Sequence, residues 1–277
     1  MSLTLCGIGY TYAAGTGFSQ RALESVSVSV APGELVLVLG ATGSGKSTLL
    51  RIAAGLLDGA DGAATIDGEP LTRKSARGRV GLVFQDAESQ LFAETLSADV
   101  AFGPRNMGRS DAEAAAAARD ALVRVGLTPA EYGERSPFSL SGGEARRAAI
   151  AGVLAFGPRY LLLDEPTAGL DAMGRRAVNA IVSEARSHAG VVVVSHSAEE
   201  FLAAADRVVV LAAGRAVYDG PAADLIADPA PFASAGLLAP DVLRIQMLAR
   251  ARGCDVGPFT LDPVHAAESL AGSFGST

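Results

Sequence analysis

A glycine-rich segment carries the residues whose types and spacing point most directly to chemistry. It follows a short apolar run, Leu35 to Leu39, and precedes a stretch able to start a helix, Thr48 to Ile52. Glycines let such a backbone wrap around a polyphosphate and aim its N–H groups at the oxygens, and the helix adds the positive end of its dipole. The segment consists of Gly40, Ala41, Thr42, Gly43, Ser44, Gly45, Lys46, Ser47 and Thr48.

Two side chains of this segment have defined roles in a phosphate-binding loop. Lys46 would reach the β- and γ-phosphates, and the Ser47 hydroxyl would hold Mg²⁺. The alternative is a glycine-rich turn with an incidental lysine. Because a strand pattern precedes the loop and a helix pattern follows it, the sequence predicts binding of a nucleoside triphosphate with Mg²⁺.

A pair of acidic residues follows a second apolar run. Asp164 and Glu165 come directly after Leu161 to Leu163, so a buried strand would deliver both carboxylates to the ligand-binding edge of an α/β sheet. Asp164 can join the Mg²⁺ shell, and Glu165 can polarise an attacking water. Strand ends also carry solvated acids, but downstream of a phosphate loop the pair favours triphosphate hydrolysis.

A serine with two glycines opens another predicted helix. Ser141, Gly142 and Gly143 would form a second anion-binding helix terminus. One nucleotide does not need two such sites in one chain, so the economical geometry is a head-to-tail pair in which each Ser-Gly-Gly covers the γ-phosphate held by the other subunit. The alternative is an ordinary capping box, with Ser141 as N-cap and Glu144 three residues later.

Three isolated residues are weaker candidates. His196 follows the run Val191–Val194 and could contact the γ-phosphate, although a lone histidine is more often structural. Gln85 ends the run Val80–Phe84 and could complete the metal shell or order the water. Tyr12 precedes the phosphate loop and could stack on a base, although most such tyrosines are packing residues.

Composition limits the classes of function. The 277 residues can form one domain with an appended piece, and 49% apolar with 19% charged residues is typical of a globular protein. A net charge of −7 argues against binding to nucleic acid and against electrostatic docking to anionic lipid. No apolar stretch is long enough for a membrane span, and none reads as a signal peptide. Cys6 and Cys254 lack metal-type spacing and indicate a reducing compartment.

The elements that must position these groups follow an α/β rhythm. Alternation between Leu3 and Asp67 predicts an antiparallel β segment, with Pro32 and Gly33 as a turn before the phosphate-loop strand. Residues 88–159 read as helical. Three buried strands separated by helical stretches are then expected, at Tyr160–Leu163, Val191–Val194 and Val208–Leu211. Near the end, Pro240 to Arg252 predicts a helix, and the chain from Gly272 is expected to fray.

Taken in order, these landmarks resemble those of the ATP-binding-cassette (ABC) ATPases. The resemblance covers about residues 3 to 225 and includes Ala168-Gly169-Leu170-Asp171. It implies a P-loop NTPase fold with a RecA-like parallel sheet, an antiparallel β subdomain and an α-helical subdomain. It also implies the following roles: base stacking for Tyr12, lid for Gln85, catalytic base for Glu165, subunit communication for Asp171 and switch for His196. The domains would be 1–228, with a helical subdomain at about 88–159, and a C-terminal extension at 229–277.

Two stretches resemble the ATPases of energy-coupling-factor importers in particular. These are Phe84 to Pro104 and Arg135 to Gly152. The resemblance implies a second ATPase subunit, identical or paralogous, and a transmembrane coupling protein docked near the segment after Gln85. It also implies a small membrane protein that captures a vitamin or a cobalt or nickel ion, and a peripheral location at the cytoplasmic face of the membrane. The region after Pro229 resembles an extension that helps hold the dimer.

Three positions depart from the family pattern. Glu144 replaces the more usual Gln, Ala87 stands where Pro is frequent, and Ser197 follows His196 where Asp is common. None of these changes removes a catalytic group, so both sites of a homodimer are expected to be active.

Two other functions are compatible with a cassette ATPase. A soluble ATPase for nucleic-acid repair or translation usually carries two cassettes, coiled-coil inserts or basic patches, which this acidic single-cassette chain lacks. A subunit of a conventional cassette importer or exporter is opposed only by the stretch from Gln85 to Pro104.

Overall fold

A computed structural model describes the backbone of residues 1–274 and the side chains of residues 1–272. Its centre is a six-stranded sheet of order β10-β9-β3-β8-β7-β6, in which only β10 runs antiparallel to its neighbour. Strands β3, β7 and β8 are buried along their whole length, as expected for apolar runs covered on both faces. The strands are β3 (Leu35–Gly40), β6 (Val80–Val83), β7 (Tyr160–Asp164), β8 (Gly190–Ser195), β9 (Arg207–Ala212) and β10 (Arg215–Pro221).

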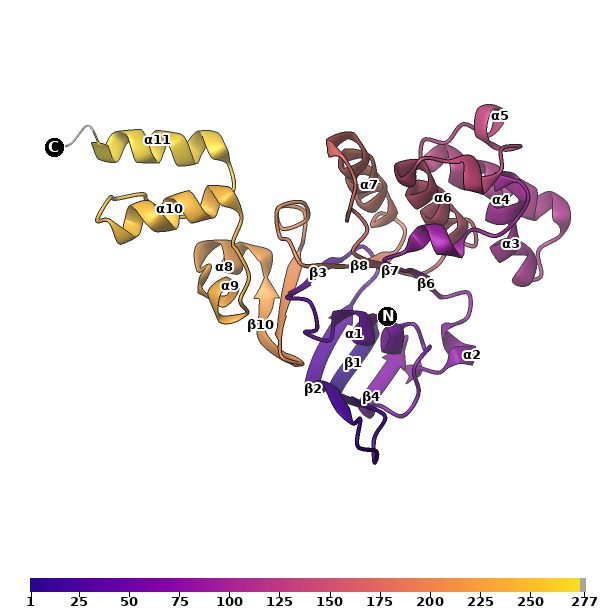
Figure 1. Ribbon diagram of the computed structural model, residues 1–277, viewed down its shortest axis with the longest axis horizontal. Helices are drawn as coiled ribbons and strands as arrows, with labels where there is room; N and C mark the ends of the chain where they lie inside the picture. Colours follow the sequence, from indigo (N-terminus) through magenta and orange to yellow (C-terminus); the bar gives the residue numbers. More distant parts are fainter. Residues whose placement is uncertain (275–277) are drawn as a thin grey trace.

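A smaller antiparallel sheet of order β2-β1-β4-β5 packs beside the central one. Helix α1 (Lys46–Ala53) follows the phosphate loop, and its apolar residues join a buried cluster with both sheets. Figure 1 shows this sheet and α1 below the central sheet. The strands are β1 (Leu3–Tyr12), β2 (Gln20–Val30), β4 (Asp61–Ile66) and β5 (Glu69–Pro70), and a short helix α2 (Arg73–Ala76) follows them.

Helices between β6 and β7 gather at one side of the central sheet, at the upper right of Figure 1. Local signals set their limits: Ser110 and Glu113 form a capping box before α4, and Gly126 adopts φ +71° just after it. The elements are η1 (Ala87–Gln90), α3 (Leu96–Asn106), α4 (Asp111–Arg124), α5 (Pro129–Tyr132), η2 (Pro137–Ser139) and α6 (Gly142–Leu154). The predicted helical character of this region is confirmed.

The C-terminal helices lie at the opposite side of the sheet, where α10 and α11 run side by side (Figure 1). Gln246 of α10 is fully buried and bonds to the backbone of Val242 in the same helix and of Thr260 in the segment before α11. The helices are α8 (Ala222–Ala227), α9 (Ala230–Ser234), α10 (Asp241–Ala251) and α11 (Pro263–Phe274). The predicted fraying from Gly272 is wrong as far as Phe274, because α11 continues to that residue; the rest of that expectation, at residues 275–277, lies outside the described residues.

One connection differs from the prediction. Helix α7 (Ala172–Ala185) joins β7 to β8 as expected, but the described residues 196–206 between β8 and β9 form turns rather than a helix. Phe201 and Leu202 are buried in the core, so packing fixes this link without continuous helical hydrogen bonds. The predicted strands themselves are confirmed.

The predicted domain boundary between residues 228 and 229 is not marked by a break in packing. Helix α9, which lies beyond it, packs Phe232 against the core and contacts β9 and β10, so the boundary stays a prediction.

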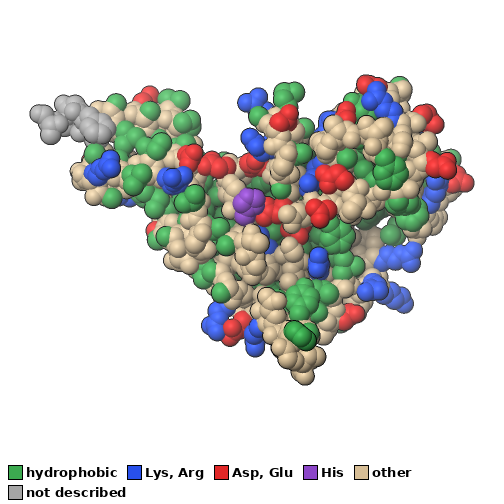
Figure 2. Space-filling view, in the orientation of Figure 1, with side chains coloured by type: hydrophobic (Ala, Val, Ile, Leu, Met, Phe, Trp, Pro, Cys, Tyr) green, Lys and Arg blue, Asp and Glu red, His purple; other side chains and the backbone are tan. Residues whose placement is uncertain are grey.

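Among the described residues, no helix combines the length and the apolar character needed to cross a bilayer. On the face shown in Figure 2, basic and acidic side chains are interspersed rather than separated by sign.

Candidate functional site

The phosphate loop connects the end of β3 to α1, and its glycines are required by geometry. Gly43 and Gly45 adopt φ +82° and +101°, which side-chain-bearing residues rarely adopt. A Cβ on Gly45 would also lie 2.5 Å from the Ala22 carbonyl oxygen, and one on Gly40 would lie 2.7 Å from that of Leu211. Glycine is therefore required at these positions, and its lack of a side chain leaves the backbone of the loop accessible.

The side chain of Lys46 folds back onto the backbone of this loop. Its side chain is buried, and Nζ donates to the carbonyl oxygens of Gly40 at 2.6 Å and Ala41 at 3.0 Å. Burial lowers the pKa of Lys46, while the charges of Glu165 and Asp164 act in the opposite direction. A cation held in this way lies where the phosphates of a nucleotide would be bound.

The carboxylate of Asp164 fits a magnesium site. It lies at the end of β7 and is only 6% exposed, and its Oδ1 has no hydrogen-bond partner in the described part of the chain. Burial raises the pKa of Asp164, and a hydrogen bond with the Ser47 side chain opposes that shift. An unpartnered buried carboxylate oxygen beside a hydroxyl suits a hard cation, whose other ligands would be water and phosphate oxygens. Within residues 1–272 no cluster of three or more His, Cys, Asp or Glu forms a metal site of protein ligands alone.

Glu165 is held beside His196. The backbone at Glu165 has φ +49°, an uncommon conformation, and its N–H donates to the carbonyl of Val194 at 2.9 Å. The Glu165 Oε2 and His196 Nδ1 atoms are 2.8 Å apart; the glutamate side chain is 11% exposed and the histidine 62%. The structure therefore joins two residues that the sequence predicted separately, at the ends of adjacent strands.

These groups share one pocket of about 380 Å³. Tyr12 lies at its edge, where its hydroxyl is 3.1 Å from the Thr48 hydroxyl and its ring makes an edge-on contact with Tyr10. The predicted site residues that line the pocket are Tyr12, Thr42, Gly43, Gly45, Lys46, Ser47, Thr48, Gln85, Asp164, Glu165 and His196.

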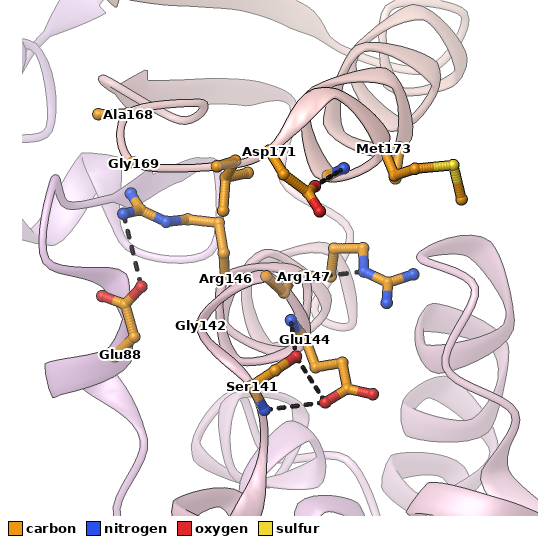
Figure 3. A pocket seen from close by; sticks show the side chains of 14 residues that line it. Glu88, Ser141, Gly142, Glu144, Arg146, Arg147, Ala168, Gly169, Asp171 and Met173 are labelled. Carbon is orange, nitrogen blue, oxygen red and sulfur yellow. Dashed lines mark hydrogen bonds and ion pairs between the residues drawn. The ribbon is translucent and has the colours of Figure 1, made fainter.

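The predicted serine–glycine site lies elsewhere. Ser141, Gly142, Gly143 and Asp171 line a second pocket of about 740 Å³, shown in Figure 3, and among the described residues the two pockets share no lining residue. Asp171 caps α7, where its Oδ1 accepts from the Gly174 N–H at 2.7 Å. Within one chain, therefore, the two predicted anion-binding elements line different pockets.

The alternative of a capping box is also present at Ser141. Its hydroxyl and N–H both donate to Oε2 of Glu144, at 2.7 and 2.8 Å, and Tyr132 donates to Oε1 at 2.8 Å (Figure 3 shows the serine contacts). Hydrogen bonds from Ser141 and then Tyr132 lower the pKa of Glu144. The cap leaves Gly142 and Gly143 open, so it is compatible with an anion-binding role.

Comparison with known proteins decides the family. The sequence matches the ABC transporter family over residues 23–168. The energy-coupling factor transporter ATP-binding protein EcfA2 of Symbiobacterium thermophilum is 45% identical over 275 residues, which cover 96% of this chain and 95% of that protein. The protein of the same name from Clostridium acetobutylicum is 39% identical over 271 residues, with 95% of each chain covered. The chain belongs to the family of energy-coupling factor transporter ATP-binding proteins.

Solved structures agree with this family of ABC ATPases. The structure of cbiO1 from Clostridium perfringens, part of the ABC transporter complex cbiONQ, has a TM-score of 0.73 at 30% identity and covers 88% of this chain and 98% of that one. A dimeric ATP-binding cassette in a post-hydrolysis state with ADP and Pi has a TM-score of 0.69 at 27% identity, covering 80% and 99%. The predicted fold and the predicted ATPase activity are confirmed.

Some pocket residues of this ATP-binding protein were not predicted. Arg21 lines the first pocket, because the hairpin pairs it with Thr11 next to Tyr12. Glu88 and Met173 line the second pocket. Arg21 could have been predicted only from the pairing register of β1 and β2. Glu88, in contrast, lies three residues after Gln85, so the motif around Gln85 could have suggested it.

Proposed function

We propose that the chain works as half of a head-to-tail ATPase dimer that energises an energy-coupling-factor importer. Each ATP would lie between Gly40–Thr48 of one subunit and Ser141–Gly143 of the other. The second subunit is a copy of this chain or a paralogue of it. The importer's cargo would be a vitamin or a transition-metal ion, which this subunit does not contact.

The observation that carries this proposal is the separation of the two anion-binding elements. One pocket holds the lysine and both carboxylates, and the other holds a helix N-terminus with open glycines. Neither alone surrounds a γ-phosphate. A two-fold axis would bring the second pocket of one subunit onto the first pocket of the other and complete both sites at once.

Within each site the side chains divide the work. Lys46 and the partner's Ser141–Gly143 would neutralise and hydrogen-bond the γ-phosphate, and Tyr12 would stack on the adenine. Glu165, oriented by His196, would accept a proton from the attacking water. Ser47, Asp164 and Gln85 would hold Mg²⁺, which when bound offsets the charge of the β- and γ-phosphates.

A separate groove suits the membrane partner. It lies in the segment after Gln85, and Phe92 and Phe102 stand there edge to face, 56% and 46% exposed. The buried carboxylate of Asp99 fixes the segment by accepting from the backbone N–H groups of Phe92 and Ala93, both at 2.8 Å. An exposed aromatic pair on a rigid support would receive a cytoplasmic helix of a transmembrane coupling protein, which itself works with a small membrane substrate-binding protein.

The dimer is tested by trapping it. Glu165→Gln, which keeps the shape of the site and removes the base, should elute as a dimer in Mg-ATP and as a monomer in ADP. Lys46→Ala added to Glu165→Gln should abolish the dimer, because the nucleotide is then no longer held. Normal turnover by Glu165→Gln would contradict the proposal, and a monomer in Mg-ATP would restrict the second subunit to a paralogue.

The membrane partner is tested by affinity purification from detergent-solubilised native membranes. The wild-type chain should retain a polytopic protein together with a small integral one, and Phe92→Asp should lose both while still forming the ATP-dependent dimer. Phe18→Asp is a matched control, because Phe18 is an exposed phenylalanine on the β1–β2 turn. Retention of a conventional permease pair without a small integral protein would instead indicate a conventional cassette transporter.

A further inference from the structure

A buried arginine that the function above does not use lies on α6, the helix that begins at Ser141. The side chain of Arg146 is only 6% exposed. It points away from the capping box, toward the segment that follows Gln85 and the loop that follows β7, and Figure 3 shows its ion pair with Glu88. A charge in such a position requires partners, because an uncompensated buried charge is strongly destabilising.

The partners of Arg146 come from two segments that carry site residues. Nη1 donates to the carbonyl oxygen of Gln85 at 2.6 Å and to that of Glu165 at 3.4 Å, and Nη2 lies 3.5 Å from Oε1 of Glu88. Its Nε is buried and has no hydrogen-bond partner within the described residues. One guanidinium therefore bridges α6, the Gln85 segment and the backbone of the residue assigned as catalytic base.

These contacts hold the backbone of Gln85 and Glu165, whose side chains are the ones assigned to the site. Glu165 has φ +49°, and a residue in that region keeps its conformation only when its surroundings determine it strongly. The planar guanidinium can reach two carbonyls and a carboxylate at the same time, whereas a lysine ammonium is a point charge without that fork. The bridge thus depends on arginine and not merely on positive charge.

We propose that Arg146 is a positioning residue that links the Ser141 end of α6 to Gln85 and Glu165. This inference rests on the proposed function, in which Ser141 of one subunit covers the nucleotide of the other. Since Ser141 and Arg146 share a helix, closure on the partner's ATP is transmitted to the Glu165 backbone of the same chain. The two sites of the dimer are thereby coupled through α6.

The test compares two arginine-to-lysine variants of the full chain. Arg146→Lys should lower kcat about 10- to 100-fold by misplacing Glu165, leave the affinity for a fluorescent ATP analogue unchanged, and reduce the Hill coefficient for Mg-ATP toward 1. Arg124→Lys is the matched control: Arg124 also joins the helical region to the core, through Glu184 of α7 at 2.9 Å, and that residue pair lines neither pocket. It should keep the wild-type kcat and Hill coefficient.

A second variant guards against misfolding. Glu88→Gln, at a half-exposed position, removes the ion pair and spares both carbonyl contacts, so it should lower kcat less than Arg146→Lys does. Wild-type kcat in Arg146→Lys, or a loss of kcat matched by lost nucleotide affinity and lower Tm, would overturn the positioning role alone. Absence of Mg-ATP hydrolysis by the unaltered chain, tested alone and together with a paralogous subunit, would overturn the proposed function and this inference with it.

Discussion

The two pockets of this chain differ in how completely one carboxylate in each is hydrogen-bonded. In the first, the Oδ1 of Asp164 is buried without a partner, and burial raises the pKa of that carboxyl. In the second, the carboxylate of Glu144 accepts from Ser141 and Tyr132, and those bonds lower its pKa. The two acids are therefore perturbed in opposite directions by opposite causes.

This difference indicates what each pocket lacks. The first pocket has a buried carboxylate oxygen without a partner, so it suits a cation that a ligand brings with it. The second has, at the N-terminus of α6, a serine whose hydroxyl is engaged in the capping box and two open glycines, so it suits an anion carried by another surface. A nucleotide held in the first pocket of another subunit meets both requirements.

The largest expected effect comes from combining a variant of the first pocket in one subunit with a variant of the second pocket in the other subunit. Lys46→Ala and Ser141→Ala should each lower kcat about 10²- to 10³-fold, because the first removes the cation proposed to bind the γ-phosphate and the second removes the N-cap that fixes the helix terminus proposed to cover it. When the chain pairs with itself, a mixture should recover activity: a mixed dimer carries both defects in one site and none in the other. With random pairing, half of the dimers are mixed and each has one intact site of two, so recovery to at most about a quarter of the wild-type rate is expected, and to less where the two sites are coupled.

The control for this mixture is each variant alone at the same total concentration. No recovery on mixing would mean that both loops serve a nucleotide bound within one subunit. The two pockets would then not have different roles toward a nucleotide shared between subunits.

A smaller effect is expected at the edge of the first pocket. Tyr12→Ala should weaken ATP binding by about 1–3 kcal/mol, because stacking of an aromatic ring on a base contributes that much. Tyr12→Phe keeps the ring and loses only the hydroxyl contact with Thr48, so it should bind ATP nearly as well as wild type. Equal weakening in both variants, measured by titration with a fluorescent ATP analogue, would assign the effect to the hydroxyl and not to stacking.

Much of the first pocket was predictable from sequence because its residues follow runs with a strong local signal. Gly40 and Asp164 end strands whose apolar residues are buried throughout, and parallel strands bring such ends to one edge. The contact between Glu165 and His196 was not predictable, because it depends on β7 and β8 being neighbours. The order of the strands is a tertiary property that no single apolar run contains.

The link between β8 and β9 was mispredicted for a related reason. Its alanine-rich composition favours helix, but the described residues 196–206 form turns, with Phe201 and Leu202 buried in the core. The bridge made by Arg146 had no sequence signal at all, since its partners are two backbone carbonyls and a half-exposed glutamate. Local patterns therefore identified groups that act through their own side chains, and missed those that act through another residue's backbone.

The burial of the Asp164 carboxylate predicts that a group needed for function lowers the stability of the nucleotide-free chain. Folding raises the pKa of Asp164 above 3.8, so its stabilising contribution is complete below pH 3.8 and is lost as pH rises through the folded pKa. At pH 7 the ionised carboxylate should cost stability, and Asp164→Asn should raise the free energy of unfolding of the nucleotide-free chain by about 1–3 kcal/mol. Urea denaturation checks this, and an unchanged or lower stability would show that Lys46 already balances the charge. Mg-dependent ATP hydrolysis should fall in the same variant.

The second pocket predicts the opposite sign with a smaller magnitude. Glu144→Gln keeps acceptors and donors for Ser141 and Tyr132 but removes a negative charge from the first turn of α6, so it should lower stability by about 0.3–1 kcal/mol at pH 7. Because folding lowers the pKa of Glu144 below 4.5, wild type loses this contribution as pH falls through the folded pKa, and the two proteins should converge in acid. Tyr132→Phe, which keeps the carboxylate, is the control and should retain the pH dependence. A Glu144→Gln protein more stable than wild type at pH 7 would mean that the carboxylate is unbalanced there too, and the contrast between the pockets would fail.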